Sequence, residues 1–385
     1  MASVQTGLDR VLNGEAILPA GPLAFCTNYT SVTEDLGRGV DALLAAGAGI
    51  RSLLTPEHGY WGAAQAGESG GDSSDAATGL PILDTYLLEG EGLDALLRRT
   101  EAPQVVVDMQ DIGTRFYTYM WTLYDLLCSA ARTETAVTVL DRPNPLGTRS
   151  AGPGLAPEAA SFVGRVSIPL QHGRTLGELA LWFNEVHVPA ATGSKAELEV
   201  ITCTENRPLG AHRWVMPSPN MPTTTTAVLY PATGLIEGTT LSEGRGTTAP
   251  FELFGAAWTD SRLAAALREH QLPGLEVREA VFRPTFSKWA GETVHGVQFH
   301  LTDAEAFEPV TTGWKVLKTI AQLYPEQQLW REQTDATRPP FIDLLWGSAA
   351  LREGIDDDAE LTEVLAASPA AEEPPAATDL YSSHR

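Results

Sequence analysis

The chain has 385 residues, more than one hydrophobic core of ordinary size organises, so about two to three domains are expected. Hydrophobic residues make up 43% of the composition and charged residues 19%, which excludes a chain that stays disordered because it lacks apolar surface. The net charge of −23 repels phosphate backbones and anionic lipid surfaces, so nucleic acid is not expected as a partner.

The first half of the chain alternates short apolar runs with helical patterns, as a parallel sheet with crossover helices requires. The predicted strands are almost continuous apolar runs suited to burial on both faces, at 21–27, 50–54, 104–109 and 136–140. The predicted helices lie at 35–46, 92–99, 116–132 and 176–187. The last of them begins with Thr175-Leu176-Gly177-Glu178, which matches a capping box. These elements predict an α/β domain over residues 1–222.

The second half changes character. Loops rich in Gly, Thr and Pro extend from Trp214 to Pro250, followed by a helical pattern at 260–270, strand-like runs at 277–282 and 294–301, and a helix at 314–323. We expect a smaller α+β domain over residues 223–360. Residues 361–385 contain the Ala, Pro and Glu-rich stretch 366–377, which predicts a loose, solvated tail.

Cysteine usage and the N-terminal residues bear on the compartment. Cys26, Cys128 and Cys203 are odd in number and far apart, which fits buried reduced thiols better than a disulfide framework or a zinc site. No stretch approaches the roughly 18 to 20 apolar residues of a membrane span. The first residues also lack the basic-then-apolar pattern of a secretory signal. We expect a cytoplasmic protein without membrane insertion, and leave an extracytoplasmic location open.

Polar turns follow three of the predicted strands, at 56–62, 108–115 and 141–145. The carboxyl ends of parallel strands share one edge of a sheet, and ligands bind in the crevice outside it, so these turns are expected to converge. Aromatic faces stack on pyranose rings, forked donors bind hydroxyls and carboxylates, and a carboxyl pair can catalyse cleavage of an acetal. The turns supply such groups for a sugar: Glu57, His58, Tyr60, Trp61, Asp108, Asp111, Arg115, Tyr117, Tyr119, Asp141 and Arg142.

Each of these residues also has a structural interpretation. Glu57 is the leading catalytic candidate because it lies between Pro56 and His58 in an aromatic turn, although a lone strand-end Glu is often a cap or a surface charge. His58 fits the role of an orienting group better than that of a base. Asp108 and Asp141 fit loop-holding hydrogen bonds as well as ligand contacts, because Asp at a strand end often fixes a turn.

Two loops of the second half, at 217–223 and 237–248, are unusually polar. Glycines bracket Glu243 and Arg245, which suggests backbone that approaches a ligand closely, whereas an isolated Gly/Thr run would be a simple turn. The pattern G-x-S-x-G around Ser69 lacks the strand and helix of a nucleophile elbow, so an esterase is disfavoured. No phosphate loop, dinucleotide fingerprint or Cys/His spacing is found, so neither a cofactor nor a metal is expected.

These motifs together resemble the exo-β-N-acetylmuramidases of the NamZ type, peptidoglycan hexosaminidases long catalogued as a domain of unknown function. The segments that carry the resemblance are TPEHGYWG (55–62), DIGTRFYTY (111–119), VLDRPNPLG (139–147), SFVG (161–164), HGRTLGELA (172–180), PSPNMPT (217–223) and residues 230–255. The resemblance implies a Rossmann-like N-terminal domain, a smaller C-terminal domain and a cleft between them. It also implies release of N-acetylmuramic acid from the non-reducing end of peptidoglycan fragments, with Glu57 as the catalytic candidate.

The partner of Glu57 is open between Glu178, Glu237, Glu243 and Asp111; the capping box makes Glu178 structural, and Glu243 is preferred. Because muramic acid carries a lactyl carboxylate, a protein of net charge −23 has to supply local positive charge, for which the candidates are Arg115, Arg142 and Arg245. The expected catalytic set is Glu57, His58 and Glu243. The expected substrate contacts are Asp111, Arg115, Tyr117, Tyr119, Asp141, Arg142, Asn144, His172, Asn220, Glu237 and Arg245.

Two positions depart from the family pattern. Ala151 stands where relatives commonly carry Glu, and Arg174 stands where Met is expected. Substrate preference could therefore differ from that of the relatives. A sugar-binding or muropeptide-binding protein without catalysis is the alternative function.

Overall fold

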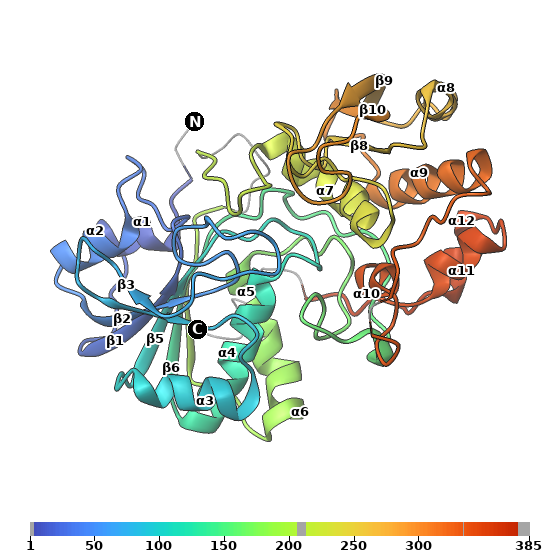
Figure 1. Cartoon of the computed structure of the whole chain (residues 1–385). Helices are drawn as coiled ribbons and strands as arrows, with labels where there is room; N and C mark the ends of the chain where they lie inside the picture. Colours follow the sequence, from blue (N-terminus) through green and yellow to red (C-terminus); the bar gives the residue numbers. More distant parts are fainter. Residues whose placement is uncertain (1–3, 206–212, 334, 376–385) are drawn as a thin grey trace.

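The computed structural model describes residues 4–205, 213–333 and 335–375 (Figure 1). A seven-stranded sheet with the order β3-β4-β2-β1-β5-β6-β7 organises the first half of the chain. All neighbouring strands are parallel except β3 and β4 at one edge. The strands are β1 (Pro22–Thr27), β2 (Gly49–Thr55), β3 (Ser73–Ser74), β4 (Pro81–Asp84), β5 (Gln104–Asp108), β6 (Ala136–Leu140) and β7 (Leu198–Ile201).

The four predicted strands are the central ones, and the sequence missed the strands at the edges. All five residues of β5 are buried, which is why that strand is a continuous apolar run. In β4 and β7 only Ile82 and Ile201 are buried, because an edge strand is covered less completely. Short, half-exposed strands leave no apolar run in the sequence, so they could not be recognised there.

Helices cover both faces of this sheet. α1 (Gly7–Leu12) and α2 (Gly39–Ala45) pack on one face against Phe25 and Val106. On the other face, α3 (Gly90–Arg99), α4 (Tyr119–Thr133) and α5 (Leu176–Trp182) pack against Val105 and Val107. α2 begins at Gly39 rather than at residue 35, because residues 33–37 form a hydrogen-bonded turn. A π-helical turn (Phe183–His187) joins α5 to α6 (Val188–Thr192), and Pro157–Ala159 form a 3₁₀ turn.

A smaller unit follows, in which a three-stranded antiparallel sheet has the order β8-β10-β9. Its strands are β8 (Leu253–Ala256), β9 (Leu275–Phe282) and β10 (Val294–Leu301), and its helices include α8 (Ser261–Glu269) and α9 (Pro309–Leu323). α7 (Thr224–Thr233), continued by the 3₁₀ turn Gly234–Gly238, was not predicted, because its threonines and Pro231 disfavour a helix. The Thr223 hydroxyl caps α7 by accepting from the Thr226 N–H at 3.1 Å. The predicted class, a Rossmann-like α/β domain followed by a smaller α+β domain, is confirmed.

The tail expected at 361–385, with its loose stretch at 366–377, instead begins with a helix and then packs against the protein in the part that the structure describes. After α10 (Phe341–Trp346) and α11 (Ala350–Asp356), residues Leu361–Ala367 form α12, which has a capping box between Glu360 and Glu363. Residues 368–375 then lie along the first half of the chain: the Gly154 N–H donates to the carbonyl of Pro369 at 2.9 Å, and Arg174 donates to that of Pro374 at 2.8 Å. We call residues 368–375 the strap. Its contacts use backbone carbonyls, which composition does not reveal.

Within the described ranges, every helix is too short or too polar to span a lipid bilayer. Of the three cysteines, Cys26 and Cys128 are buried and Cys203 is half-buried, each as a free thiol.

Candidate active site

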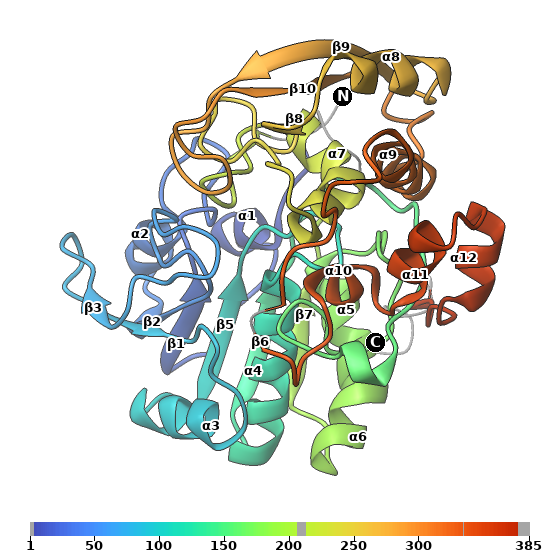
Figure 2. The ribbon, with the colours of Figure 1, turned by 45° about the vertical axis from the view of Figure 1, so that its right-hand side comes forward.

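The parallel strands point toward the second half of the chain, with α7 beyond their carboxyl ends (Figure 2). Glu57 lies two residues after β2, at this edge of the sheet. Its carboxylate is buried, and each oxygen accepts one hydrogen bond: Oε1 from the Gly67 N–H at 2.7 Å and Oε2 from the Thr118 hydroxyl at 2.7 Å. Among the residues that the structure describes, no cation pairs with Glu57. The Glu57 carboxylate is thus oriented by two neutral donors.

His58 fixes the loop that carries Glu57. Its backbone adopts a φ of 70°, and its N–H donates to the carbonyl of Glu68 at 3.0 Å. Nδ1 lies 3.0 Å from the carbonyl oxygen of Ala64, so Nδ1 carries the hydrogen and donates it. Burial lowers the pKa of the imidazole, and the Glu57 carboxylate partly offsets that effect. A neutral His58 therefore orients the loop next to Glu57.

Four alternating charges form a network in the second half of the chain. Arg245 donates through Nη2 to Glu237 at 2.7 Å, and its Nε lies 3.2 Å from a Glu243 oxygen. The Lys288 ammonium lies 3.0 Å from the other Glu243 oxygen and donates to the carbonyls of Ile236 and Leu241 at 3.1 and 2.9 Å. Burial lowers the pKa of Lys288, against the opposing effect of Glu243. Glu243 is 2% exposed and paired with two cations, so its environment differs from that of Glu57.

Tyr230 links this charge network to Glu57. Its hydroxyl donates to Glu237 at 3.3 Å, and its ring packs edge-on against Phe251 and Phe116, with centroids 4.7 and 5.1 Å away. Burial, together with the carboxylates of Glu237 and Glu57, raises the pKa of Tyr230 well above its usual value. Residues from both halves of the chain thus meet around this phenol, as convergence at the carboxyl edge of the sheet requires.

The predicted aromatic residues Tyr117 and Tyr119 are buried beside Glu57 and contact each other edge-on, with centroids 4.8 Å apart. Tyr119 donates to the carbonyl of Pro217 at 2.5 Å, and Asn220 donates to the Gln65 side chain at 2.8 Å. The 217–223 loop is therefore attached to the start of α4 and to the Glu57 loop.

Several predicted contacts instead hold the protein together. Arg115 is completely buried and donates to four carbonyls, those of Pro153, Ile168, Leu345 and Trp346. It has no surface to offer a sugar, so we do not retain the prediction that Arg115 binds substrate. The guanidinium joins the first half of the chain to α10.

Asp141 and Asn144 also have structural partners. Asp141 accepts from the Gly177 N–H at 2.8 Å and from the Thr175 hydroxyl at 2.7 Å, both at the start of α5. Asn144 accepts from the Leu146 N–H at 2.8 Å within its own turn. Of the two interpretations that the sequence left open for Asp141, the geometry favours the loop-holding one. We therefore do not carry either residue forward as a substrate contact.

Arg142 is committed to Asp108, with Nε 2.5 Å and Nη2 2.9 Å from the two carboxylate oxygens, and both side chains are buried. His172 and Asp111 form a second buried pair at 3.1 Å, and Asp111 also accepts from the Gly113 N–H at 2.7 Å. These pairs fix the strand-end turns. Arg142, Asp111 and His172 therefore position these turns rather than contact the substrate.

Two further predictions from sequence concern side chains outside the site. The structural role of Glu178 is confirmed, because its carboxylate accepts from the Thr175 N–H at 2.8 Å in the predicted capping box. Ser69 donates to Asp84, between β2 and the two-residue β3, so no strand-to-helix elbow presents its hydroxyl.

Sequence reasoning missed Thr118, Tyr230 and Lys288. Thr118 and Tyr230 lie inside motifs that were recognised, but a Thr next to an aromatic cluster gives no separate signal. Lys288 belongs to the connection between β9 and β10, and its partners at 236–243 are distant in sequence.

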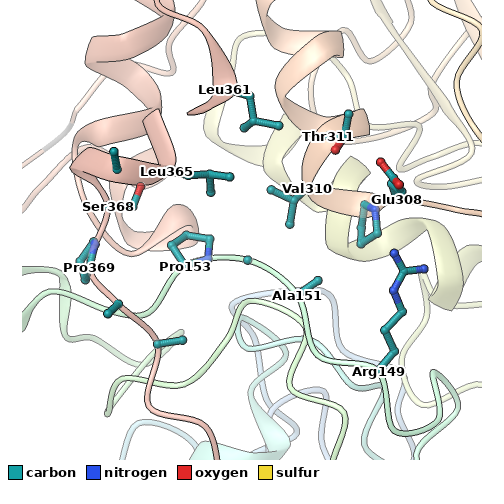
Figure 3. A pocket seen from close by; sticks show the side chains of 15 residues that line it. Arg149, Ala151, Pro153, Glu308, Val310, Thr311, Leu361, Leu365, Ser368 and Pro369 are labelled. Atoms are coloured by element: carbon teal, nitrogen blue, oxygen red, sulfur yellow. The ribbon is translucent and has the colours of Figure 1, made fainter. Parts of the chain in front are cut away.

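A cavity of about 610 Å³ lies elsewhere, where the first half of the chain meets α9, α12 and the strap (Figure 3). Val310, Leu361 and Leu365 line it with apolar groups, and Ala151 belongs to its wall. None of the predicted catalytic or substrate-contact residues lines this cavity. Its apolar lining suits a sugar less well than the polar groups around Glu57.

The fold is an α/β protein with a buried carboxylate at the carboxyl edge of its parallel sheet, a place where enzymes of this class bind ligands. Residues 23–225 match the family described as exo-β-N-acetylmuramidase NamZ, N-terminal, and residues 228–373 match its C-terminal counterpart. The chain therefore belongs to the NamZ family of exo-β-N-acetylmuramidases.

Relatives and solved structures agree with this assignment. The peptidoglycan β-N-acetylmuramidase NamZ of Bacillus subtilis strain 168 is 43% identical over 332 residues, which cover 84% of this chain and 78% of the relative. Two crystal structures of DUF1343 family proteins from Bacteroides fragilis are each 28% identical. One has a TM-score of 0.82 and covers 94% of both chains; the other has a TM-score of 0.72 and covers 95% of this chain and 94% of its own.

Proposed function

We propose that this protein releases N-acetylmuramic acid from the non-reducing end of peptidoglycan fragments, in cell-wall turnover or recycling. The observation that carries the proposal is the buried Glu57 carboxylate, which lies at the carboxyl edge of the sheet without a cation partner among the described residues. The family membership supplies the substrate class. A small carbohydrate is thus the proposed ligand, and a cytoplasmic location remains part of the proposal.

In the proposed reaction, Glu57 is the general acid. It donates a proton to the glycosidic oxygen as the bond to the anomeric carbon breaks. Water then supplies the hydroxyl of the released sugar, and the other proton of that water restores the acid form of Glu57. Glu243 fits a different role because Arg245 and Lys288 pair with it: it holds these two cations in place. His58 orients the acid loop.

Arg245 is the proposed partner of the lactyl carboxylate. Arg115 and Arg142 are committed to carbonyls and to Asp108, whereas Nη1 of Arg245 has no hydrogen-bond partner within the described ranges. The ring of Phe251 supports the guanidinium from 4.9 Å. An arginine held by two carboxylates is preorganised to bind a third carboxylate, to which its remaining N–H groups donate.

The direct test is turnover. Purified protein is incubated with a disaccharide of N-acetylmuramic acid and N-acetylglucosamine, with muramic acid at the non-reducing end, and the released sugars are quantified by mass spectrometry. We expect catalytic release of free N-acetylmuramic acid. Saturable binding without release would instead favour the sugar-binding alternative and would overturn the proposal.

Arg245→Lys should weaken discrimination between the two amino sugars. Lysine keeps the positive charge but lacks the fork, so the lactyl carboxylate loses a directed hydrogen bond worth about 1.5–3 kcal/mol. We expect the inhibition constant of N-acetylmuramic acid to rise by roughly ten-fold or more. N-acetylglucosamine, which lacks the lactyl group, is the control, and its inhibition constant should change little. An equal rise for both sugars would contradict the assignment.

Thr118→Val should lower kcat more than it raises KM. The substitution keeps the shape of a buried side chain but removes the donor that fixes Glu57, and hydrogen bonds to charged groups contribute about 1.5–3 kcal/mol. We expect kcat for release of N-acetylmuramic acid to fall by about ten- to a hundred-fold. Thr118→Ser retains the hydroxyl and should restore most of the rate. If Thr118→Val and Thr118→Ser have the same kcat, the Thr118 hydroxyl does not position Glu57.

A further inference from the structure

Trp61 is an exposed aromatic residue within the loop that carries Glu57. Its side chain is 53% exposed, although it lies only four positions after the buried Glu57. Tyr60, between them, is buried and contacts the indole edge-on with centroids 4.9 Å apart. The loop thus turns its acid inward and its indole outward.

The indole is held in a fixed orientation. The guanidinium of Arg38 lies over the ring at 5.3 Å from its centroid. That guanidinium is itself bound by Asp75, which is completely buried, at 2.7 Å, and by Asp41 at 3.0 Å. A large apolar ring that is both exposed and immobilised loses little conformational entropy when a ligand covers it.

A series of aromatic rings connects this position to the acid. The Tyr29 N–H donates to the carbonyl of Tyr60 at 2.9 Å, and the Tyr29 ring packs so closely on Gly62 that a Cβ there would lie 1.7 Å from it. Tyr29 is also close enough to the Tyr117 and Tyr119 phenols to help raise the pKa of both, after the larger effect of burial. Exposure falls along the series, from Trp61 through half-buried Tyr29 to the two buried tyrosines.

This order gives the site an inner and an outer end. An exo-acting enzyme encloses the terminal sugar at the inner end, and the rest of the glycan has to leave across the outer end. We propose that Trp61, with Tyr29 beside it, forms the surface on which the sugar next to the cleaved bond stacks. The inference rests on the proposed function and adds to it the residue that recognises the leaving saccharide.

The test compares substrates with and without a second sugar. Trp61→Ala, Trp61→Leu and Trp61→Phe are assayed on the methyl glycoside of N-acetylmuramic acid and on its disaccharide with N-acetylglucosamine. For Ala and Leu we expect kcat/KM on the disaccharide to fall by about five- to ten-fold more than on the methyl glycoside. Phe keeps an aromatic face and should retain most of the disaccharide activity, while Leu separates stacking from simple apolar contact.

The outcomes distinguish the inference from the function on which it rests. If wild type hydrolyses neither substrate, the proposed function fails. If the wild type is active, two results for Trp61→Ala refute the stacking surface: an equal loss of activity on both substrates, or no loss on either. The melting temperature of each variant shows whether it is folded. If Trp61→Leu is as active as Trp61→Phe on the disaccharide, the inference is also overturned.

Discussion

Glu57→Gln is expected to abolish hydrolysis while the protein stays folded. The amide has the shape of the carboxylate but no proton to donate, so the rate should fall by about 10²–10⁴-fold, the usual contribution of a general acid. The environment tolerates the change: the amide oxygen accepts from the Gly67 N–H, and the Thr118 hydroxyl rotates to accept from the amide NH₂. Release of N-acetylmuramic acid from the disaccharide measures the effect.

Glu178→Gln is the matched control for this variant. Glu178 is another buried carboxylate, and Gln serves equally well as the third residue of a capping box. The control should keep both its melting temperature and its turnover. Wild-type turnover by Glu57→Gln would rule out Glu57 as the acid. An equal loss in both variants would show that replacing a buried carboxylate by an amide disturbs the fold rather than the chemistry.

Arg115→Met is expected to have the largest effect on stability. Four carbonyls, from Pro153, Ile168, Leu345 and Trp346, lose their donor at once in a completely buried position. Each buried acceptor left unpaired costs about 1–3 kcal/mol, so a total loss of roughly 4 kcal/mol or more in the free energy of unfolding is expected. Urea unfolding and the melting temperature report this loss.

Arg115→Lys separates the structural interpretation from the earlier expectation of substrate binding. An ammonium has three donors and satisfies part of the carbonyl set, so an intermediate loss of stability with nearly unchanged KM is expected. A rise in KM with an unchanged melting temperature would restore Arg115 to the substrate site.

The sequence was informative where the physical signal is local. A buried strand followed by a polar turn is visible in one stretch of residues, and it predicted both the central sheet and the position of Glu57. The resemblance then supplied the chemistry that local pattern could not.

The sequence was less informative where partners are distant. The four carbonyls that bind Arg115 include two that lie 230 and 231 residues along the chain. The ion pair between Lys288 and Glu243 likewise joins a loop of the small sheet to a Gly-rich turn. Residue types alone could not tell that Arg115 is bound by backbone carbonyls while Arg245 pairs with two carboxylates, because both are arginines in recognised motifs.

The strap and the Arg115 contacts have a consequence for biosynthesis. The sheet domain leaves the ribosome before the second half of the chain. Two of the four carbonyl partners of Arg115, at Leu345 and Trp346, come 230 and 231 residues later, and the Pro374 partner of Arg174 comes 200 residues later. Until that segment is made, a buried guanidinium of the early domain has only part of its hydrogen bonds. The first half of the nascent chain therefore stays short of its final stability until the strap segment has been translated.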